Sequence, residues 1–247
     1  MTTDKRVFVA GAAGVIGRVL CRLLLDDGWQ VVGTTRKPEA ARALAALGVE
    51  PVIVDVFDAG ALRTAVLRAR PQAVIHQLTD LPKQFDADAL KSALPRNAAL
   101  REVGTRNLVD ACVAAGVCHV IAQSIAFAYA PGPKPYTEES PLNVGASDPA
   151  AARTALAVQV LESLVLAGPF RGVVLRYGRL YGPGTWASAP PPGAPVHVDA
   201  AADAARKALA SGAAGIYNVA EPDGTVSVAK AVAQLGWSPS FRVQRAG

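Results

Sequence analysis

The sequence predicts an α/β fold in which a doubly wound parallel sheet carries helices on both faces and a small lobe follows at the C-terminus. Two patterns predict it. Short, strongly apolar segments alternate with longer amphipathic segments over residues 5–176. The short segments are apolar at successive positions, which is typical of parallel strands buried on both faces. The 247 residues, 51% of them hydrophobic and 18% charged, suffice for one large core and exclude a mainly disordered chain.

The alternation assigns each segment in turn. We expect strands at residues 5–10, 30–34, 51–54, 73–76, 117–122 and 172–176. We expect helices at residues 14–27, 39–47, 59–69, 88–115 and 149–167, the fourth of them kinked near Pro95. A strand–helix order that repeats in this way forms a sheet whose ligands bind at the carboxyl ends of the strands. Binding residues should therefore follow the strands.

The pattern changes after Arg176. Residues 182–195 hold five prolines and three glycines without periodicity, which predicts a loop. Beyond this loop we expect a helix at 199–210 with Asp199 as its N-cap, a strand at 215–219 and a helix at 226–235. We therefore divide the chain into a main domain, residues 1–178, and a small lobe, residues 179–247, which is interleaved with the main domain and not independent.

Composition and charge exclude several classes of partner and site. The net charge of +5 is spread along the chain without a basic stripe, so we expect no nucleic-acid partner. Three cysteines and three histidines without clustered spacing indicate neither a metal site nor a disulfide framework. No apolar run reaches the ~20 residues of a membrane span, so we expect no membrane partner. The segment after Lys5 imitates a secretion signal, but Arg18 interrupts it, and we expect a cytoplasmic protein.

The most specific motif is Gly11-Ala-Ala-Gly14-Val-Ile-Gly17, between the first expected strand and the first expected helix. Gly11 permits a tight turn, Gly14 lets a pyrophosphate approach the backbone, and Gly17 lets the helix pack closely on the strand. Free N–H groups at the helix N-terminus also favour phosphate. The motif predicts a dinucleotide site that includes Val15 and Ile16, and the alternative is a purely structural turn.

The residues after the second and third expected strands bear on which dinucleotide binds. Folds that bind NAD usually carry a carboxylate after the second strand, which accepts hydrogen bonds from the ribose. Here that position holds Thr35 and Arg36, and Arg36 suits the 2′-phosphate of NADP. We therefore expect NADP, with NAD as the alternative, unless Arg36 is only a solvated charge. Asp55 and Val56 are expected near the adenine, unless Asp55 only caps the next helix.

Further motifs extend over most of the chain. They are Val74-Ile-His-Gln, Gly104-Thr-Arg-Asn-Leu, Gln123-Ser124, Leu175-Arg-Tyr-Gly, Tyr181-Gly-Pro-Gly and His197-Val-Asp199. Together with the glycine turn, they resemble the extended branch of the short-chain dehydrogenase/reductase superfamily, the NAD-dependent epimerases and dehydratases. The resemblance implies a Rossmann fold, a cofactor lined by Leu78 and Thr79, and Ser124 beside the nicotinamide. It also implies a homodimer formed by the helices at 88–115 and 149–167.

The chain departs from this family at the catalytic pair. Members carry Tyr-x-x-x-Lys on the helix after the fifth strand, where the tyrosine transfers a proton and the lysine lowers the pKa of the tyrosine. Counting back from Glu162, Thr154 stands at the tyrosine position and Val158 at the lysine position. Threonine is a poor acid and valine has no ionisable group, so the sequence does not support the usual mechanism.

Two functions remain open. In the first, the chain is an atypical NADP-dependent oxidoreductase in which Ser124 and Tyr129 replace the catalytic pair. Its substrate would be a small carbonyl or hydroxyl compound, because the short C-terminal lobe argues against a nucleotide sugar. In the second, the chain is a redox sensor or regulator that binds NAD(P) without turning it over. We interpret His76, at the end of the fourth strand, as a core histidine and not as a base.

Overall fold

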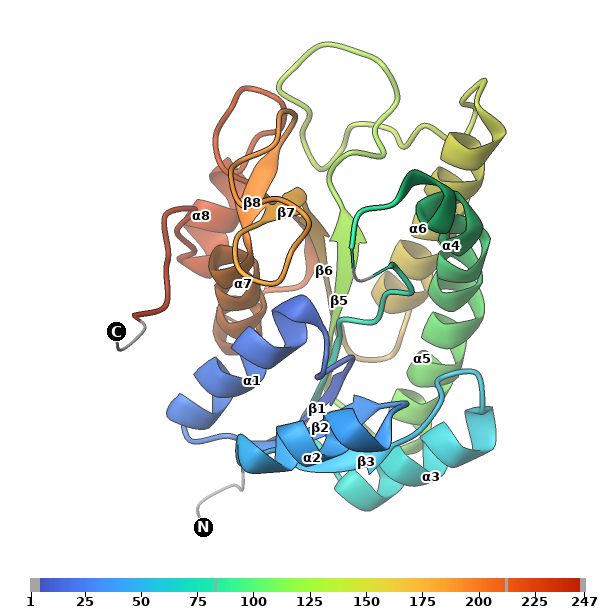
Figure 1. Cartoon of the computed structure of the whole chain (residues 1–247), viewed down its shortest axis with the longest axis vertical. Helices are drawn as coiled ribbons and strands as arrows, with labels where there is room; N and C mark the ends of the chain where they lie inside the picture. The colour runs from blue at the N-terminus through green and yellow to red at the C-terminus, as the bar shows by residue number, and fades with distance from the viewer. Residues whose placement is uncertain (1–4, 83, 212, 245–247) are drawn as a thin grey trace.

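The computed structural model describes residues 5–82, 84–211 and 213–244, and its centre is a parallel sheet of seven strands (Figure 1). The strands are β1 (Arg6–Ala10), β2 (Gln30–Thr35), β3 (Glu50–Ile53), β4 (Ala73–His76), β5 (His119–Ile125), β6 (Arg171–Tyr177) and β9 (Gly215–Val219). Their order across the sheet is β3-β2-β1-β4-β5-β6-β9, and every neighbouring pair is parallel. The order reverses between β1 and β4, which confirms the doubly wound fold.

Helices cover both faces of the sheet (Figure 1). One face carries α1 (Val15–Asp26), α2 (Pro38–Ala46), α7 (Val198–Ser211) and α8 (Ala229–Leu235), and the other carries α3 (Ala59–Ala69), α4 (Ala87–Ala99), α5 (Thr105–Ala114) and α6 (Pro149–Leu166). The alternation of β1 shows the reason for two cores. Val7 and Val9 enter the core on the first face, while Phe8 enters the core on the second. A strand that buries both faces must be apolar throughout.

The long helix expected at 88–115 is interrupted, but not where the sequence suggests. Pro95 lies inside α4, which continues to Ala99. A five-residue π-helical segment, η1 (Leu100–Gly104), then joins α4 to α5. The interruption of the helix therefore begins after Pro95, at Leu100, and the kink near Pro95 stays a prediction. Segments of π-helix inside α-helices often occur at functional sites, because they displace side chains from the regular helical spacing.

The C-terminal part of the chain differs from the sequence expectation in three details. A second small sheet pairs β7 (Arg179–Tyr181) with β8 (Pro195–His197), at the ends of the expected loop. Helix α7 begins at Val198, so Asp199 is not its N-cap. The carboxylate of Asp199 instead accepts a hydrogen bond from the backbone N–H of Val243. Helix α8 begins at Ala229, three residues later than expected.

The segment from α7 to α8 belongs to the main sheet and its core. Strand β9 lies at its edge beside β6, and α7 packs against α1 (Figure 1). Side chains of α7, β9 and α8 enter the same core as those of β1 and α1. The domain boundary at residue 178 stays a prediction.

Helix α6, with 18 residues, is the one helix of the described residues that is long and apolar enough to cross a membrane. Its inner face packs on the sheet and carries Glu162, which pairs with Arg176 of β6. A buried ion pair to a neighbouring strand is typical of a core helix, and we interpret α6 as one.

Candidate functional site

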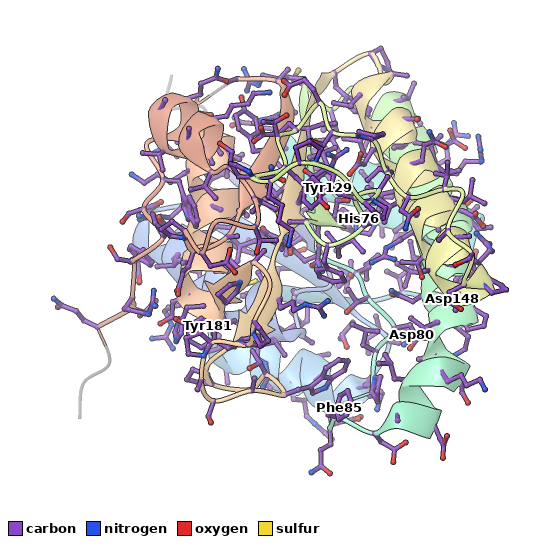
Figure 2. All side chains as sticks on the ribbon, turned by 90° about the horizontal axis from the view of Figure 1, so that it is seen from above. His76, Asp80, Phe85, Tyr129, Asp148 and Tyr181 are labelled. Atoms are coloured by element: carbon purple, nitrogen blue, oxygen red, sulfur yellow. The ribbon has the colours of Figure 1, made fainter. Side chains whose placement is uncertain are left out.

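A cavity of about 460 Å³ lies at the carboxyl ends of β1, β2 and β4. Eight of the cofactor residues expected from the sequence line it: Gly11, Gly14, Thr35, Arg36, Asp55, Val56, Leu78 and Thr79. Residues Val15, Ile16, Gly17 and Ser124, also expected there, are not among the lining residues. Figure 2 looks down on this edge of the sheet, with Asp80 and Phe85 on one side and Tyr181 on another.

The glycine turn has the geometry that a dinucleotide requires. Gly11 has a φ of +89°, and a Cβ there would lie 2.6 Å from the carbonyl oxygen of Gln77. A Cβ on Gly17 would lie 2.2 Å from the carbonyl oxygen of Gly11, so α1 packs directly on the turn. Gly14 caps α1 without a side-chain hydrogen bond, which leaves N–H groups of the first helical turn available to a phosphate. The residues present therefore fit a dinucleotide.

The end of β2 presents a cation to the cavity. The hydroxyl of Thr35 accepts a hydrogen bond from the backbone N–H of Lys37, and the half-exposed Arg36 side chain extends beyond it. Nη2 of Arg36 lies 3.6 Å from Oδ1 of Asp80, whose Oδ2 accepts a hydrogen bond of 3.0 Å from Nε of Arg96. Sequence reasoning missed Asp80, on the β4–α4 connection, and Arg96, on α4, because both lie far along the chain from Arg36.

Asp55 and Asp58 have separate roles at the start of α3. The carboxylate of Asp58 accepts a hydrogen bond from the backbone N–H of Ala61 at 2.9 Å and caps the helix. Asp55 accepts one from the backbone N–H of Phe57 at 3.0 Å and also lines the cavity. Since Asp58 alone provides the cap, Asp55 remains available to a ligand.

Ser124 joins a buried ion pair beneath the end of β5. Its hydroxyl donates a hydrogen bond of 2.7 Å to Oε1 of Glu162. Arg176 donates to both oxygens of the same carboxylate, from Nε at 2.8 Å and from Nη2 at 2.6 Å. All three side chains are buried. Such a bidentate pair in a dry environment fixes the orientation of the serine hydroxyl.

Tyr129 belongs to the same network. Its hydroxyl donates to Oδ1 of Asn218 at 2.6 Å and accepts from Nη1 of Arg176 at 2.9 Å. Its ring stacks on Tyr136, with ring centroids 5.2 Å apart. Burial raises the pKa of Tyr129, which disfavours loss of its proton. Neither Ser124 nor Tyr129 lines the cavity, and both hydroxyl groups are already hydrogen-bonded within the protein.

The face of α6 that points to the sheet is apolar one turn before Glu162. Val158 is fully buried in a cluster with Ile125, Ala128 and Leu142. Thr154, one turn earlier still, is half-buried. Residues four apart share a helix face, so Thr154, Val158 and Glu162 form one stripe along α6. Sequence reasoning identified Val158 but missed its neighbours, because Ile125 and Leu142 are ordinary core residues in the sequence.

His76 is a hydrogen-bonded core residue, as expected. Nδ1 accepts a hydrogen bond from the backbone N–H of Leu78, and Nε2 lies 3.0 Å from the hydroxyl of Thr105. Burial, together with the charge of Arg101, lowers the pKa of His76 to about 4. His76 is therefore neutral at pH 7. Within the described ranges, no three His, Cys, Asp or Glu side chains come together as they would at a metal ion.

The β4–α4 connection, which includes the cavity-lining residues Leu78 and Thr79, contacts the β7–β8 loop. The indole N–H of Trp186, in the β7–β8 loop, donates a hydrogen bond of 2.9 Å to the carbonyl of Pro82. The ring of Trp186 also contacts Phe85 edge to face, with ring centroids 5.7 Å apart. Both aromatic rings stay partly exposed. They give the β4–α4 connection and the β7–β8 loop a shared aromatic surface, which the sequence alone does not indicate.

Comparison with known proteins identifies the family. The model of the NAD dependent epimerase/dehydratase family matches residues 7–194. The enzyme WbmH of Bordetella bronchiseptica, solved in complex with NAD+, has a similar fold, with a TM-score of 0.72 and 22% sequence identity over 90% of this chain and 77% of that chain. At this identity, the likeness concerns the fold alone.

Two curated relatives are closer in sequence. The chain is 48% identical over 181 residues to a 3-diazoavenalumate denitrifying reductase of a Streptomyces species, which covers 73% of this chain and 58% of the relative. It is 30% identical over 121 residues to a Candida albicans protein provisionally named an NADPH-dependent methylglyoxal reductase, which covers 45% of this chain and 34% of the relative. In both cases the match spans less than two thirds of the relative's own length.

Proposed function

The chain belongs to the NAD dependent epimerase/dehydratase family, and from this premise we propose that it is an NADPH-dependent reductase that works without a protein acid. The observation that carries the proposal is the apolar cluster around Val158. Its substrate would be a small electrophilic compound that accepts a hydride and needs no proton from the enzyme.

The preference for NADPH is supported by the charges at the end of β2. Arg36 lines the cavity, and Thr35 stands where an NAD-specific fold would carry a carboxylate. Arg36 would bind the 2′-phosphate, Asp55 the adenosine end, and the N-terminus of α1 the pyrophosphate. The Candida albicans relative, whose name specifies NADPH, supports the same preference.

The absence of a protein acid is proposed from the stripe on α6. Thr154 and Val158 would replace the proton-transferring tyrosine and its lysine. Val158 is surrounded by Ile125, Ala128 and Leu142, so the position offers neither a proton nor a charge. Ser124 and Tyr129 would not substitute, because each hydroxyl proton is committed to an acceptor within the protein. We assign both residues to positioning.

The substrate class follows from the proton balance. When bound, reduced nicotinamide supplies a hydride. Reduction of a carbonyl to an alcohol consumes that hydride and a proton, so a site without an acid is poorly suited to it. An aryl diazonium group consumes the hydride alone: a C–H bond forms, the C–N bond breaks, and its electron pair leaves with N₂. The name of the Streptomyces relative describes reductive removal of nitrogen from a diazo compound, and we propose the same reaction type here.

The test uses NADPH that is deuterated at its transferable position, together with a carboxylated benzenediazonium salt. We expect N₂ release and deuterium on the ring carbon that carried nitrogen. Two controls measure direct reduction by NADPH. The first reaction mixture contains no protein, and the second contains a Gly11→Ala variant, whose new Cβ would collide with Gln77. Turnover of methylglyoxal but not of the diazonium salt would overturn the substrate class. Tight NADPH binding without any turnover would favour the redox-sensor alternative.

We also propose that the protein is a homodimer formed through α5 and α6. A shallow groove between these helices is lined by residues that include Val109, Val160 and Leu164. Large apolar side chains also lie exposed on the two helices, Val113 on one and Leu156 on the other. Exposed apolar surface of this kind is typical of subunit interfaces. Light scattering coupled to gel filtration should give twice the mass of the chain, and Leu156→Glu should give the monomer.

The cytoplasm is the compartment that we propose for this enzyme. Cys21, Cys112 and Cys118 are all free thiols, which suits a reducing environment. Fractionation of cells that express the tagged protein should recover it with cytoplasmic markers, and recovery with secreted or membrane fractions would contradict the assignment.

A further inference from the structure

Arg101 is a buried cation for which the described part of the chain provides no hydrogen-bonded partner. It lies on the π-helical segment η1, with only 8% of its surface exposed. By contrast, Arg176, the other buried arginine near Glu162, donates hydrogen bonds to both oxygens of the Glu162 carboxylate. For Arg101, no hydrogen bond or ion pair to any residue within the described part of the chain exists. A buried charge that lacks a partner carries a large desolvation penalty, which a bound anion would offset.

The charged and titratable neighbours of Arg101 place it near the carboxyl end of β4. Electrostatic interactions link it to His76, at the end of β4, and to Glu162 of α6. The preceding residue, Leu100, lines the dinucleotide cavity. Segment η1 packs against α6, whose inner face carries Val158 one turn before Glu162. Segment η1 therefore lies beside α6, and the guanidinium is near enough to Glu162 for their charges to interact.

The guanidinium stays a reachable cation. Burial lowers the pKa of Arg101 to about 10, and the charge of Glu162 opposes that change, so the group is positive at pH 7. Glu162 does not neutralise it by contact, since both of its oxygens are bound by Arg176. Among the described residues, the fully sealed side-chain nitrogen and oxygen atoms without a partner belong to Arg6, Gln77 and His119. The unpaired nitrogens of Arg101 are not among them, so they keep some accessible surface.

We infer that Arg101 is a substrate-binding residue and that the substrates are aromatic carboxylates, whose carboxylate the guanidinium receives. This inference rests on the proposed reductase function and names the substrate class for it. Arginine matches a carboxylate with two parallel hydrogen bonds. The partly exposed aromatic pair Phe85–Trp186 would contact the rest of such a molecule. The Streptomyces relative also acts on a carboxylate, as its name indicates.

The test compares the affinities of two ligands of the same shape for the protein, which is saturated with NADP+. Cinnamate carries the carboxylate, and cinnamamide replaces it with a neutral amide. Calorimetric titration of the wild-type protein should give cinnamate the higher affinity by about tenfold or more, the usual effect of a charge-assisted contact. Arg101→Met should abolish this preference, and Arg101→Lys should keep part of it. The matched control is Arg63→Met, which removes a charge from the exposed face of α3 and should leave the preference intact.

Thermal unfolding provides a readout that a merely structural arginine would not share. Replacing an unpaired buried cation with methionine of similar length removes a desolvation penalty, so the melting temperature of Arg101→Met should equal or exceed that of the wild type. A marked fall in the melting temperature would assign Arg101 a structural role and overturn the inference. Equal affinity of the wild type for cinnamate and cinnamamide, or binding of neither, would also overturn it.

The affinity for NADPH separates this inference from the proposed function. Arg101→Met should bind NADPH as tightly as the wild type, because the residues that would hold the dinucleotide are unchanged. If the wild type binds and oxidises NADPH but Arg101→Met keeps the cinnamate preference, the inference alone fails. If the wild type does not bind NADPH, the proposed function fails whatever the result with cinnamate.

Discussion

The hydroxyl of Ser124 donates a hydrogen bond to Oε1 of Glu162 at 2.7 Å, within a carboxylate that Arg176 binds through both oxygens. This contact directs the serine proton toward the interior of the protein, away from the cavity beside β1 and β4. A serine in such a position stabilises the network and is a poor proton donor to a substrate. The relationship decides how mutations at the end of β5 should behave.

Ser124→Ala should reduce stability more than activity. The change removes one hydrogen bond to a buried carboxylate, which costs about 1–2 kcal/mol in the free energy of unfolding. A lost general acid would instead reduce kcat by about 100-fold or more. We expect the first effect in urea unfolding and less than about a threefold change in kcat. Ser124→Thr, which keeps the hydroxyl, is the matched control and should restore stability.

The Glu162–Arg176 pair offers a second stability prediction. Glu162→Gln leaves the Arg176 guanidinium buried without its counter-charge and should lower the free energy of unfolding by about 3–5 kcal/mol. Replacing both residues by methionine removes both desolvation penalties, so the double variant should be more stable than Glu162→Gln. Urea unfolding of the three proteins gives the comparison. Similar losses in the single and double variants would show that the pair is not a coupled unit.

Arg36 and Asp80 should have opposite effects on NADPH affinity. Arg36→Ala removes a contact to the 2′-phosphate. It should lower the affinity for NADPH about 10- to 100-fold and change the affinity for NADH by less than about twofold. Asp80→Asn releases Arg36 from a half-exposed ion pair and should raise the affinity for NADPH by no more than about fivefold. Nicotinamide fluorescence titration measures both affinities. Arg42→Ala, on the exposed side of α2, controls for loss of charge. If Arg36→Ala lowered the affinities for NADPH and NADH equally, Arg36 would not contact the 2′-phosphate.

His76 should make the folded state sensitive to acid. Its folded pKa of about 4 lies below the ordinary histidine pKa of 6.5. The unfolded chain therefore takes up a proton in this range while the folded chain does not, so the stabilising effect is present above pH 6.5 and is lost as the pH falls toward 4. The full difference corresponds to about 3 kcal/mol. Urea unfolding at a series of pH values should show a shallower dependence for His76→Gln.

A second histidine shares this window. Burial lowers the pKa of His119 to about 4, with Arg171 acting in the same direction. His119→Gln should also flatten the pH dependence of unfolding, and the double variant should flatten it most. An unchanged slope in all three variants would mean that neither histidine is buried as the structure shows.

Local sequence patterns predicted the parts of the fold that depend on local physics. Each strand of the main sheet from β1 to β6 is a short apolar run, and the alternation of such runs with helices was enough to assign the doubly wound sheet. The glycine turn was predictable for the same reason, since Gly11 and Gly17 serve contacts with neighbouring backbone that any such turn requires.

Contacts between distant segments were beyond the sequence. The ion pair of Arg36 with Asp80 and the hydrogen bond of Ser124 with Glu162 join residues on different elements, and nothing near either residue in the sequence indicates its partner. The π-helical segment at 100–104 was missed because Pro95 offered a simpler local reason for a kink. Strands β7 and β8 were missed because each has three residues and pairs only across a loop rich in proline.

The most direct test of a reductase without a protein acid is a pair of isotope effects on a single turnover. The protein, saturated with NADPH, is mixed with a carboxylated benzenediazonium salt, first with deuterium at the transferable position of NADPH and then in D₂O. We predict a slower reaction with deuterated NADPH and an unchanged rate in D₂O, because hydride moves and no enzyme proton does. A slower reaction in D₂O that Ser124→Ala or Tyr129→Phe abolishes would identify a protein acid and contradict the account.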